Sequence, residues 1–432
     1  MGKVKQLGLL KNKMDLKQQL NEMGEKAKAA SAVLNTAPSI QKNSFFDFAI
    51  KEIKSDQELI LMANHQDVAQ ARDAGKDAAF IDRLELNQDR LEDICATLEE
   101  IKLFPDPVGK ILANWDRPNG LNISRVSTPL GVIGIIFESR PNVASDAGGL
   151  CLKSGNAVIL RSGKDGLRSA SALVTAMQKA LLKAGLPKES IQIVPSENRE
   201  AATLMLEGLN GSIDVIVPRG GKSLVAEVEK SAKVPVFGHL EGICHVYVDE
   251  HADLKKALEI CINAKMRRTG ICGAAETILL HQKIATSFGS DLIAKLSSLN
   301  CEVRGCKKTL SLDRYVIPAT EEDWSTEYLA PIISIKVVDD AEEAIQHINS
   351  YGTGHTESII SEDLNSQNQF TASIDSAIVM INTSTQFADG GEFGLGGEIG
   401  IATGKFHARG PVGLDQLTSF KYIVSGDGQI RL

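Results

Sequence analysis

The segment K-M-R-R-T-G-I-C-G-A-A-E-T, residues 265–277, contains the side chain best suited to covalent chemistry in this sequence. Cys272 follows a group of cations, with Gly270 two residues before it and Gly273 directly after it. A cysteine reacts as its thiolate, which nearby positive charge favours. Gly273 leaves room for a reacting carbonyl group, and backbone N–H groups there would receive the negative charge that develops on its oxygen. We therefore predict that Cys272 is a nucleophile.

The remaining cysteines lack this setting, and we expect them to be buried and inert: Cys95, Cys151, Cys244, Cys261, Cys301 and Cys306. The total of seven is odd and no pair is spaced C-x-x-C, which argues against a disulfide framework or a zinc knuckle and favours a reducing compartment. No His/Asp/Glu group has metal-ligand spacing, so we expect no metal. We expect three histidines to be structural: His245, His281 and His355.

Two loops that follow predicted strands combine glycine with cations. Open parallel sheets bind ligands beyond the carboxyl ends of their strands, and this composition suits a phosphate group better than an ordinary loop. We assign to such a ligand Arg161, Ser162, Gly163 and Lys164 from the first loop, and Arg219, Gly220 and Gly221 from the second. A nucleotide-kinase P-loop is disfavoured, because it would need glycine where Ile216 stands. The G-V-I-G at residues 131–134 precedes its strand, which disfavours an ordinary Rossmann dehydrogenase.

The elements that position these residues fall into an α-helical part and two strand–helix series. Residues 11–104 are typical of helices and end at F-P-D-P, where two prolines stop any helix. Short apolar strands alternate with amphipathic helices over residues 132–217 and again over 245–381, which predicts two parallel sheets. We place the boundary between them near Val234-Pro235 and predict a last strand over residues 418–424.

The bulk properties are those of a folded globular protein with two to three domains. The chain has 432 residues and a net charge of −8, so a nucleic-acid-binding surface is not favoured. It contains no run of about 18 apolar residues that would span a membrane. The basic residues 1–20 lack the apolar core and cleavage site of a signal peptide, so we expect a cytoplasmic protein.

Several motifs of the sequence resemble those of a known family. T-G-I-C-G-A at residues 269–274 resembles the cysteine loop of the aldehyde dehydrogenase superfamily, T-P-L-G-V-I-G at 128–134 its P-x-G-V-x-G strand, and E-F-G at 392–394 a late element. Longer blocks are similar to the gamma-glutamyl phosphate reductase branch: residues 105–109, 137–142, 267–277 and 387–413. The resemblance runs from about residue 40 to the C-terminus.

The resemblance implies an α/β fold with two Rossmann-like parallel-sheet domains and a small β oligomerisation flap. The cofactor domain would comprise residues 1–118 and 132–235, the catalytic domain 236–405, and the flap 119–131 and 406–432. The flap makes a homo-oligomer the expectation. The implied reaction is the NADPH-dependent reduction of L-glutamyl 5-phosphate to glutamate 5-semialdehyde, without a metal, in proline biosynthesis. A glutamate 5-kinase would then be a candidate partner.

The resemblance also assigns individual residues. Cys272 matches the catalytic cysteine, Arg161 a position near the adenosine ribose, and Glu327 a glutamate that contacts the nicotinamide ribose. Candidates for binding phosphate or the substrate's α-carboxylate are Arg267, Arg268, His407 and Arg409, for which a solvated surface role is the alternative.

Two departures from the hydrolytic members of the superfamily are informative. His239 stands where those enzymes carry a water-activating glutamate, and Arg140 where they carry the oxyanion asparagine, with Asn142 two residues further on. We predict that Asn142 assists Cys272 in holding the oxyanion. The alternatives are a hydrolytic NAD(P)-dependent aldehyde dehydrogenase, which His239 disfavours, and a non-enzymatic scaffold, which the intact cysteine loop disfavours.

Overall fold

The computed structural model describes residues 15–395 and 397–431. The chain forms two compact units, one comprising the residues up to Val236 together with those from Leu417, the other Phe237–Gln416. Residues 1–14, which include part of the basic stretch 1–20 and the first four residues of the predicted helical segment, lie outside the described residues. The labels given to the parts of the chain, cofactor domain, catalytic domain and flap, remain predictions.

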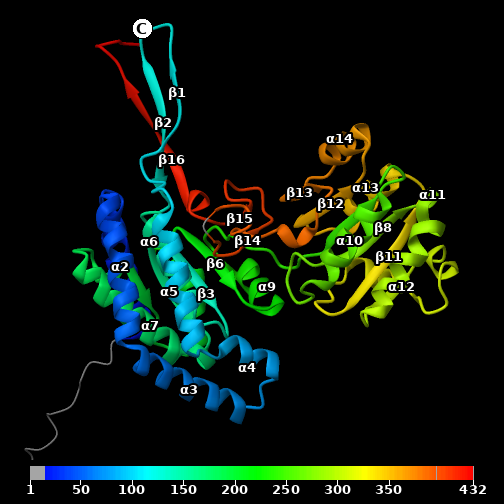
Figure 1. Cartoon of the computed structure of the whole chain (residues 1–432). Helices are drawn as coiled ribbons and strands as arrows, with labels where there is room; N and C mark the ends of the chain where they lie inside the picture. The colour runs from blue at the N-terminus through cyan, green and yellow to red at the C-terminus, as the bar shows by residue number, and fades with distance from the viewer. Residues whose placement is uncertain (1–14, 396, 432) are drawn as a thin grey trace, which may run out of the picture. The chain divides into compact units, whose positions relative to one another are not determined.

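The first unit begins with the expected helices (Figure 1): α1 (Leu16–Leu34), α2 (Ser39–Ser55), α3 (Gln57–Asp73), α4 (Ala78–Leu84) and α5 (Gln88–Leu103). The last of them illustrates why they form. The Asn87 side chain accepts a hydrogen bond from the Arg90 N–H and so caps the first turn of α5. The apolar residues of α5 recur every three or four positions and are buried. The helix ends just before Pro105, because the residue that precedes a proline disfavours the helical conformation.

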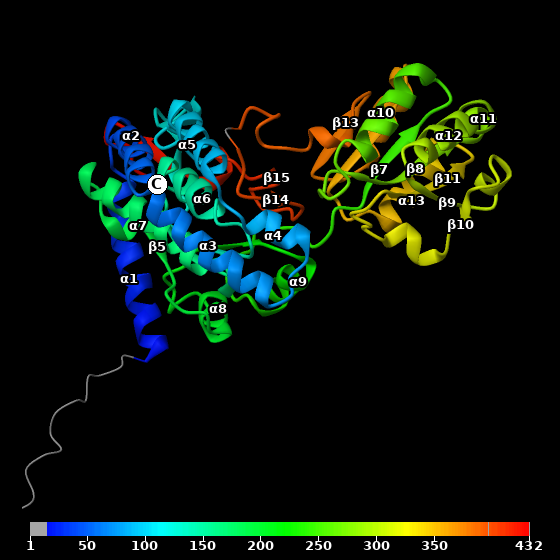
Figure 2. The same ribbon diagram turned by 60° about the horizontal axis from the view of Figure 1, so that its bottom comes forward.

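The first parallel sheet has the strand order β5-β4-β3-β6. Its strands are β3 (Val132–Phe137), β4 (Ala157–Ser162), β5 (Ile191–Ile193) and β6 (Val215–Arg219). Every residue of β3 and β4 is buried, as expected for a parallel sheet covered on both faces. The connecting helices are α6 (Val143–Lys153), α7 (Leu167–Lys183), α8 (Arg199–Leu206) and α9 (Lys222–Ser231), and α1 packs against β4 and β5 (Figure 2).

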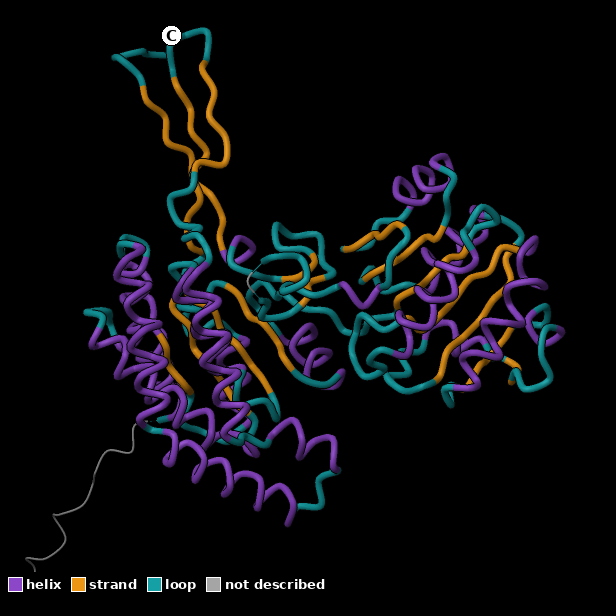
Figure 3. Tube along the Cα trace, viewed as in Figure 1, coloured by secondary structure: helices purple, strands orange, loops and turns teal. Residues whose placement is uncertain are grey.

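A separate three-stranded antiparallel sheet extends from the helices of this unit (Figure 3). It consists of β1 (Ile111–Asp116), β2 (Asn122–Pro129) and β16 (Thr418–Ser425) in the order β1-β2-β16. The last strand is the one predicted over residues 418–424. β1 lies earlier than the predicted flap, because its mostly exposed residues do not alternate and so gave no strand pattern.

The second unit is built on a seven-stranded parallel sheet in the order β10-β9-β11-β8-β7-β12-β13. Its strands are β7 (Cys244–Val248), β8 (Ala275–His281), β9 (Glu302–Gly305), β10 (Ile317–Pro318), β11 (Ile332–Val338), β12 (Thr356–Ile360) and β13 (Ile378–Ile381). The strands β9 and β10 were not predicted. β9 is only partly buried and β10 consists of two exposed residues, so neither gives an apolar strand pattern. A small pair, β14 (Ile401–Ala402) and β15 (Gly410–Pro411), lies outside this sheet.

Helices cover both faces of the seven-stranded sheet. Val246 and Ile278 point to the face that α10 (Leu254–Met266) and α12 (Ser290–Ser298) cover. Their neighbours Tyr247 and Leu279 point to the face covered by α13 (Ala341–Tyr351) and α14 (Leu364–Ser373). This alternation is the normal consequence of the strand period of two. The short helix α11 (Gln282–Ile284) follows β8. None of the described helices is long and apolar enough to cross a membrane.

Candidate active site

The candidate site lies at the amino ends of four neighbouring strands of the seven-stranded sheet. In the order β11-β8-β7-β12, each strand is preceded within a few residues by one polar side chain: Glu327, Cys272, His239 and His355. Because amino ends of parallel strands meet at one edge, the topology brings these segments together although more than a hundred residues separate His239 from His355.

The Cys272 loop connects α10 to β8 and packs tightly against two other segments. A Cβ atom added at Gly242 would lie 2.3 Å from the carbonyl oxygen of Cys272 and 2.8 Å from its Cβ. One added at Gly273 would lie 3.0 Å from the Thr385 carbonyl oxygen. The Cys244 thiol donates a hydrogen bond of 3.1 Å to the Cys272 carbonyl. Close backbone approach therefore requires glycine at position 242 and favours it at position 273.

Two histidines lie beside Cys272. One ligand-type atom of each of His239, Cys272 and His355 lies within 4.8 Å of the other two. The two imidazole rings are 4.8 Å apart between centroids and meet edge to face. His239 Nδ1 lies 2.8 Å from the Ile401 carbonyl oxygen, which can only accept, so Nδ1 carries the proton and Nε2 the lone pair of the neutral ring.

His355 was expected to be structural, and the structure places one of its ring nitrogens within 4.8 Å of the Cys272 sulfur. Its side chain is fully buried, and burial, with a smaller effect of the neighbouring His239, lowers its pKa to about 3. The ring is therefore neutral at physiological pH. Sequence reasoning missed it because position 355 shares no local motif with Cys272, and only the adjacency of β12, β7 and β8 connects them.

A buried ion pair fixes both ends of the Cys272 loop. Lys265, at the end of α10, lies 2.5 Å from the Glu276 carboxylate in β8, and both side chains are almost completely buried. Burial raises the pKa of Glu276 to about 7 despite the opposing charge of Lys265. Glu276 also accepts the N–H of Leu329 at 3.3 Å, two residues after Glu327. The pair thus connects the Cys272 loop to the segment before β11.

We expect Glu276→Gln to destabilise the protein by about 3–5 kcal/mol, because it leaves the Lys265 ammonium buried without its carboxylate. The matched control is Glu362→Gln, which removes an ion pair with Lys256 in which both side chains are half exposed, and should cost less than about 1 kcal/mol. Thermal or urea unfolding of both variants measures the difference. Equal destabilisation by the two substitutions would contradict a supporting role for the buried pair.

The other cysteines mostly agree with the sequence-based expectation. Burial raises the pKa of Cys95, Cys151, Cys244 and Cys261, and that of Cys301 to about 11. Cys306 departs from the expectation, since it is only half-buried. The effect of its burial is outweighed by hydrogen bonds from the Thr309 hydroxyl and from backbone N–H groups, which lower its pKa.

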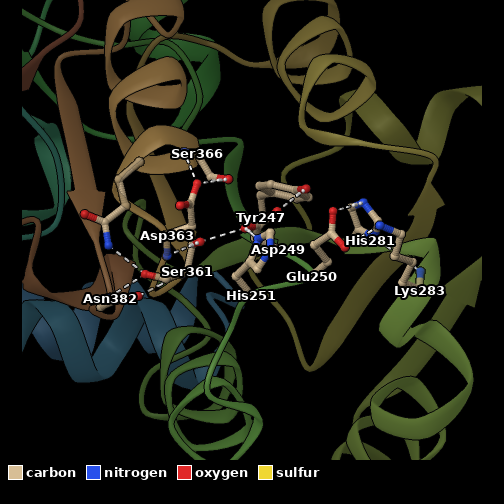
Figure 4. Close-up of polar contacts among 11 residues, drawn as sticks. Tyr247, Asp249, Glu250, His251, His281, Lys283, Ser361, Asp363, Ser366 and Asn382 are labelled. Carbon is tan, nitrogen blue, oxygen red and sulfur yellow. Dashed lines mark hydrogen bonds and ion pairs between the residues drawn. The ribbon is translucent and has the colours of Figure 1, made fainter.

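The opposite edge of this sheet is filled by the chain's own polar groups (Figure 4). Beyond the carboxyl ends of β7 and β12, the Asp249 carboxylate accepts hydrogen bonds from the Tyr247 hydroxyl at 3.0 Å and the Ser361 hydroxyl at 2.6 Å. The Asn382 side chain bonds the backbone N–H and carbonyl of Ser361. β7 and β12 are neighbours in the sheet, but the chain continues from β7 to β8 on one side of this pair and from β12 to β13 on the other side. The carboxyl ends of two strands at such a switch point normally bind ligands. Here it is a closed structural network.

The four predicted substrate-binding residues do not share one environment. Arg267 lines a cavity of about 310 Å³ with Glu259, Asn263, Ser384 and Glu392 among the other lining residues. Arg268, the residue after Arg267, is exposed. His407 stacks edge to face on Phe237 at 5.3 Å. Arg409 forms an ion pair of 2.7 Å with Asp375 and donates to its carbonyl, which favours a structural role. The structure therefore places Arg267 alone of the four on this cavity.

Comparison with known proteins decides the family. The model of the aldehyde dehydrogenase family matches residues 10–308 and 316–423. The chain belongs to the aldehyde dehydrogenase family. It is 56% identical to the gamma-glutamyl phosphate reductase of Brucella suis over 96% of this chain and 99% of that protein. Identity to the enzyme of Parvibaculum lavamentivorans is 54%, over 97% and 99% of the two chains. The crystal structure of the Thermotoga maritima gamma-glutamyl phosphate reductase superposes with a TM-score of 0.94 at 44% identity, over 96% of this chain and all of that one.

These matches confirm the resemblance predicted from the cysteine loop and the longer blocks, and with it the aldehyde dehydrogenase-like fold with parallel sheets. The chain is thus an oxidoreductase of this family. An engineered glycolyl-CoA reductase with bound NADP+ has the same fold at 18% identity and a TM-score of 0.66.

In this aldehyde dehydrogenase family member the predicted cofactor loops meet at the carboxyl edge of the four-stranded sheet. Strand register places Ser162 and Arg219 on either side of Phe137, at the ends of β4, β3 and β6. Arg161 is buried there with an Nε atom that has no hydrogen-bond partner among the described residues, whereas Lys164 is exposed. A buried guanidinium with unused hydrogen-bonding capacity beside glycine-containing loops fits the phosphate-rich half of a dinucleotide.

Three further predicted residues have partners in the structure. Gly221 N–H donates to the Glu138 carboxylate at 3.4 Å, next to Gly220 at the start of α9. Glu327 accepts the N–H of Gly242 at 2.9 Å and so supports the segment that packs on Cys272. Asn142 lies in the first unit, where its amide donates to Asp146 at 2.9 Å and retains a second N–H for another acceptor.

Proposed function

We propose that the protein reduces L-glutamyl 5-phosphate to glutamate 5-semialdehyde and phosphate with NADPH, through a thioester on Cys272, as the second step of proline biosynthesis from glutamate. Near full-length similarity to enzymes named gamma-glutamyl phosphate reductase supports the substrate. The observation that carries the chemistry is the cysteine loop at the amino edge of the sheet, with His239 beside Cys272 where hydrolytic relatives carry a carboxylate.

In the proposed mechanism the Cys272 sulfur attacks the acyl carbon and phosphate leaves. The lone pair of His239 Nε2 would accept the thiol proton, because the Ile401 carbonyl holds the proton of this ring on Nδ1. Backbone N–H groups of the Cys272 loop, and Asn142, would hold the oxyanion. Phosphate is a good leaving group, so no strong general acid is required. NADPH, when bound, supplies the hydride that reduces the thioester. The resulting thiohemiacetal then collapses, releasing the aldehyde and restoring the Cys272 thiolate.

The cavity beside Arg267 supports an amino-acid substrate. Arg267 would bind an α-carboxylate, whereas Glu259 and Glu392 would bind an α-ammonium group, so both charges of the glutamyl end have a counterpart. The Arg267 guanidinium is oriented by Gln386, whose amide also donates to the Ala264 and Arg268 carbonyls. The roles of Arg268, His407 and Arg409 remain predictions.

The assay that tests this function runs in reverse, with NADP+, glutamate 5-semialdehyde and phosphate, and follows formation of the reduced nicotinamide. Phosphate-dependent activity is the expected result. Phosphate-independent oxidation would favour a hydrolytic aldehyde dehydrogenase, because an ordinary hydrolysis of the thioester needs no phosphate. No activity in either buffer would favour a non-enzymatic scaffold and would overturn the proposal.

We expect kcat/KM with NADPH to exceed kcat/KM with NADH by at least about tenfold. Arg161 and Lys164, at the carboxyl end of β4, would attract the 2′-phosphate of the adenosine ribose, which a carboxylate would repel. Lys164→Glu should narrow the preference. The matched control is Lys188→Glu, an exposed lysine before the amino end of β5, which should leave the preference unchanged. Equal values for the two cofactors in the wild type would contradict this assignment.

We further propose a cytoplasmic homo-oligomer that associates through the antiparallel sheet β1-β2-β16. Large apolar side chains of this sheet are exposed in the single chain, among them Trp115, Tyr422 and Val424. Exposed aromatic and aliphatic groups on a sheet favour association. A glutamate 5-kinase as partner also remains a proposal. Light scattering of the wild type and of Tyr422→Lys would test the role of the sheet.

A further inference from the structure

The cluster formed by His239, Cys272 and His355 has the composition of a three-residue metal site. One sulfur and two imidazole nitrogens come from three separate segments, and the three ligand-type atoms lie within 4.8 Å of one another. Zn²⁺ prefers cysteine sulfur and histidine nitrogen in tetrahedral geometry, at about 2.3 and 2.0–2.1 Å. Those bond lengths place ligand atoms roughly 3.3–3.6 Å apart, so side-chain rotations of about 1 Å would close the site.

The hydrogen bonds around the two rings orient them as metal ligands. The Ile401 carbonyl accepts from His239 Nδ1, which leaves the Nε2 lone pair as the coordinating position. His355 Nδ1 lies 2.9 Å from the Thr356 hydroxyl and 3.5 Å from the Cys244 sulfur. Since the Cys244 thiol donates its proton to the Cys272 carbonyl, its sulfur is left to accept from His355 Nδ1. The Thr356 hydroxyl can accept from the same Nδ1 proton, so these contacts favour the tautomer with the lone pair of His355 on Nε2.

His355 Nε2 is the second observation that indicates a ligand. The residue is completely buried, and this nitrogen has no hydrogen-bond partner among the described residues. A buried polar atom without a partner is costly, and it requires either a water molecule or another ligand. His239 and Cys272 are only partly buried, so the cluster is accessible to an ion from their side.

We propose that His239, Cys272 and His355 bind one Zn²⁺ ion, leaving the fourth coordination position to solvent, and that this ion reversibly inhibits the enzyme. Coordination replaces the proton of the Cys272 thiol by the metal, and the proton passes to solvent. A zinc-bound sulfur is no longer available for acylation, and the same ion prevents its oxidation. Metal binding is independent of the proposed reaction; only the inhibition depends on Cys272 being the nucleophile.

Titration of the metal-free, full-length protein with Co²⁺ tests the binding directly. We expect one equivalent to produce a near-ultraviolet thiolate-to-cobalt charge-transfer band, which Zn²⁺ then abolishes by displacing the cobalt. Cys272→Ala should remove the band. His355→Asn should weaken Zn²⁺ binding by at least about a hundredfold, because the asparagine amide can retain the bond to Thr356 but offers nothing in place of Nε2.

Two controls keep the result interpretable. His251→Asn, which alters a half-exposed histidine of the same unit, and Cys306→Ser should leave both the band and the zinc affinity unchanged. If His355→Asn does not fold, His239→Asn should show the same loss of affinity. Absence of the cobalt band in the wild type, or zinc binding that survives Cys272→Ala undiminished, would overturn the proposal. Failure of the phosphate-dependent assay alone would leave the metal site standing and reject only the proposed function.

Discussion

Cys272→Ala is expected to lower turnover by at least about four orders of magnitude while leaving the fold and cofactor binding intact. Removal of a covalent nucleophile abolishes both halves of a two-step route, and the remaining positioning groups cannot replace it. Alanine keeps the Cβ atom that packs on Gly242, so the loop should keep its shape. Steady-state rates in the phosphate-dependent direction measure the loss, and NADPH titration measures cofactor affinity.

The matched control is Cys306→Ala. Cys306 is, like Cys272, only partly buried, and the hydrogen bonds it accepts lower its pKa, so it is the rival most similar in reactivity. We expect this variant to retain at least half of the wild-type rate. Mass spectrometry of protein mixed with acyl phosphate should find the acyl adduct on residue 272. Retention of a tenth of wild-type activity by Cys272→Ala, or an adduct on Cys306, would show that the nucleophile lies elsewhere.

The prediction that Cys272 is the nucleophile could be made from the sequence because the features on which it rests are local. Gly270, Gly273 and the preceding cations lie within a few residues of Cys272. The family was predictable for the same reason, since its motifs are contiguous blocks. His355 was not predictable in this way. Its proximity to Cys272 depends on the order β8-β7-β12, and neither the β-strand pattern nor any spacing between positions 272 and 355 specifies that order.

A general rule of sheet topology applies to one of the two candidate sites and not to the other. The rule that ligands bind beyond carboxyl ends led to the prediction of a cofactor site at the edge of the first sheet, where Arg161 and Arg219 lie. In the second sheet the Cys272 cluster lies at the amino edge, and the carboxyl edge is closed by the Asp249–Ser361 network. The Lys265–Glu276 ion pair could not be predicted from the sequence either. Charged side chains are usually solvated, and only the fold shows that these two, eleven positions apart, are both buried and in contact.

The close packing of Gly242 on Cys272 leads to the second large expected effect. Gly242→Ala should lower kcat/KM by about a hundredfold or more. The added methyl group would lie 2.3 Å from the Cys272 carbonyl oxygen, so that one of the two backbones must move. A misplacement of about 1 Å at a reacting group is enough to cost two orders of magnitude. Gly242 N–H also donates to Glu327, so the displacement would reach the segment before β11 as well.

A graded series of glycines separates this local effect from the general cost of an added methyl group. Gly404→Ala, in the same unit, meets no atom within 4 Å and should behave as the wild type. Gly273→Ala, where the added Cβ would lie 3.0 Å from the Thr385 carbonyl, should be intermediate. The rate of Cys272 alkylation and kcat/KM should fall in the order 404, 273, 242, while cofactor affinity stays constant. If Gly242→Ala keeps kcat/KM within threefold of Gly404→Ala, the position of Cys272 does not depend on this contact, and the other contacts of its loop, including the Lys265–Glu276 pair and the Cys244 hydrogen bond, must hold it.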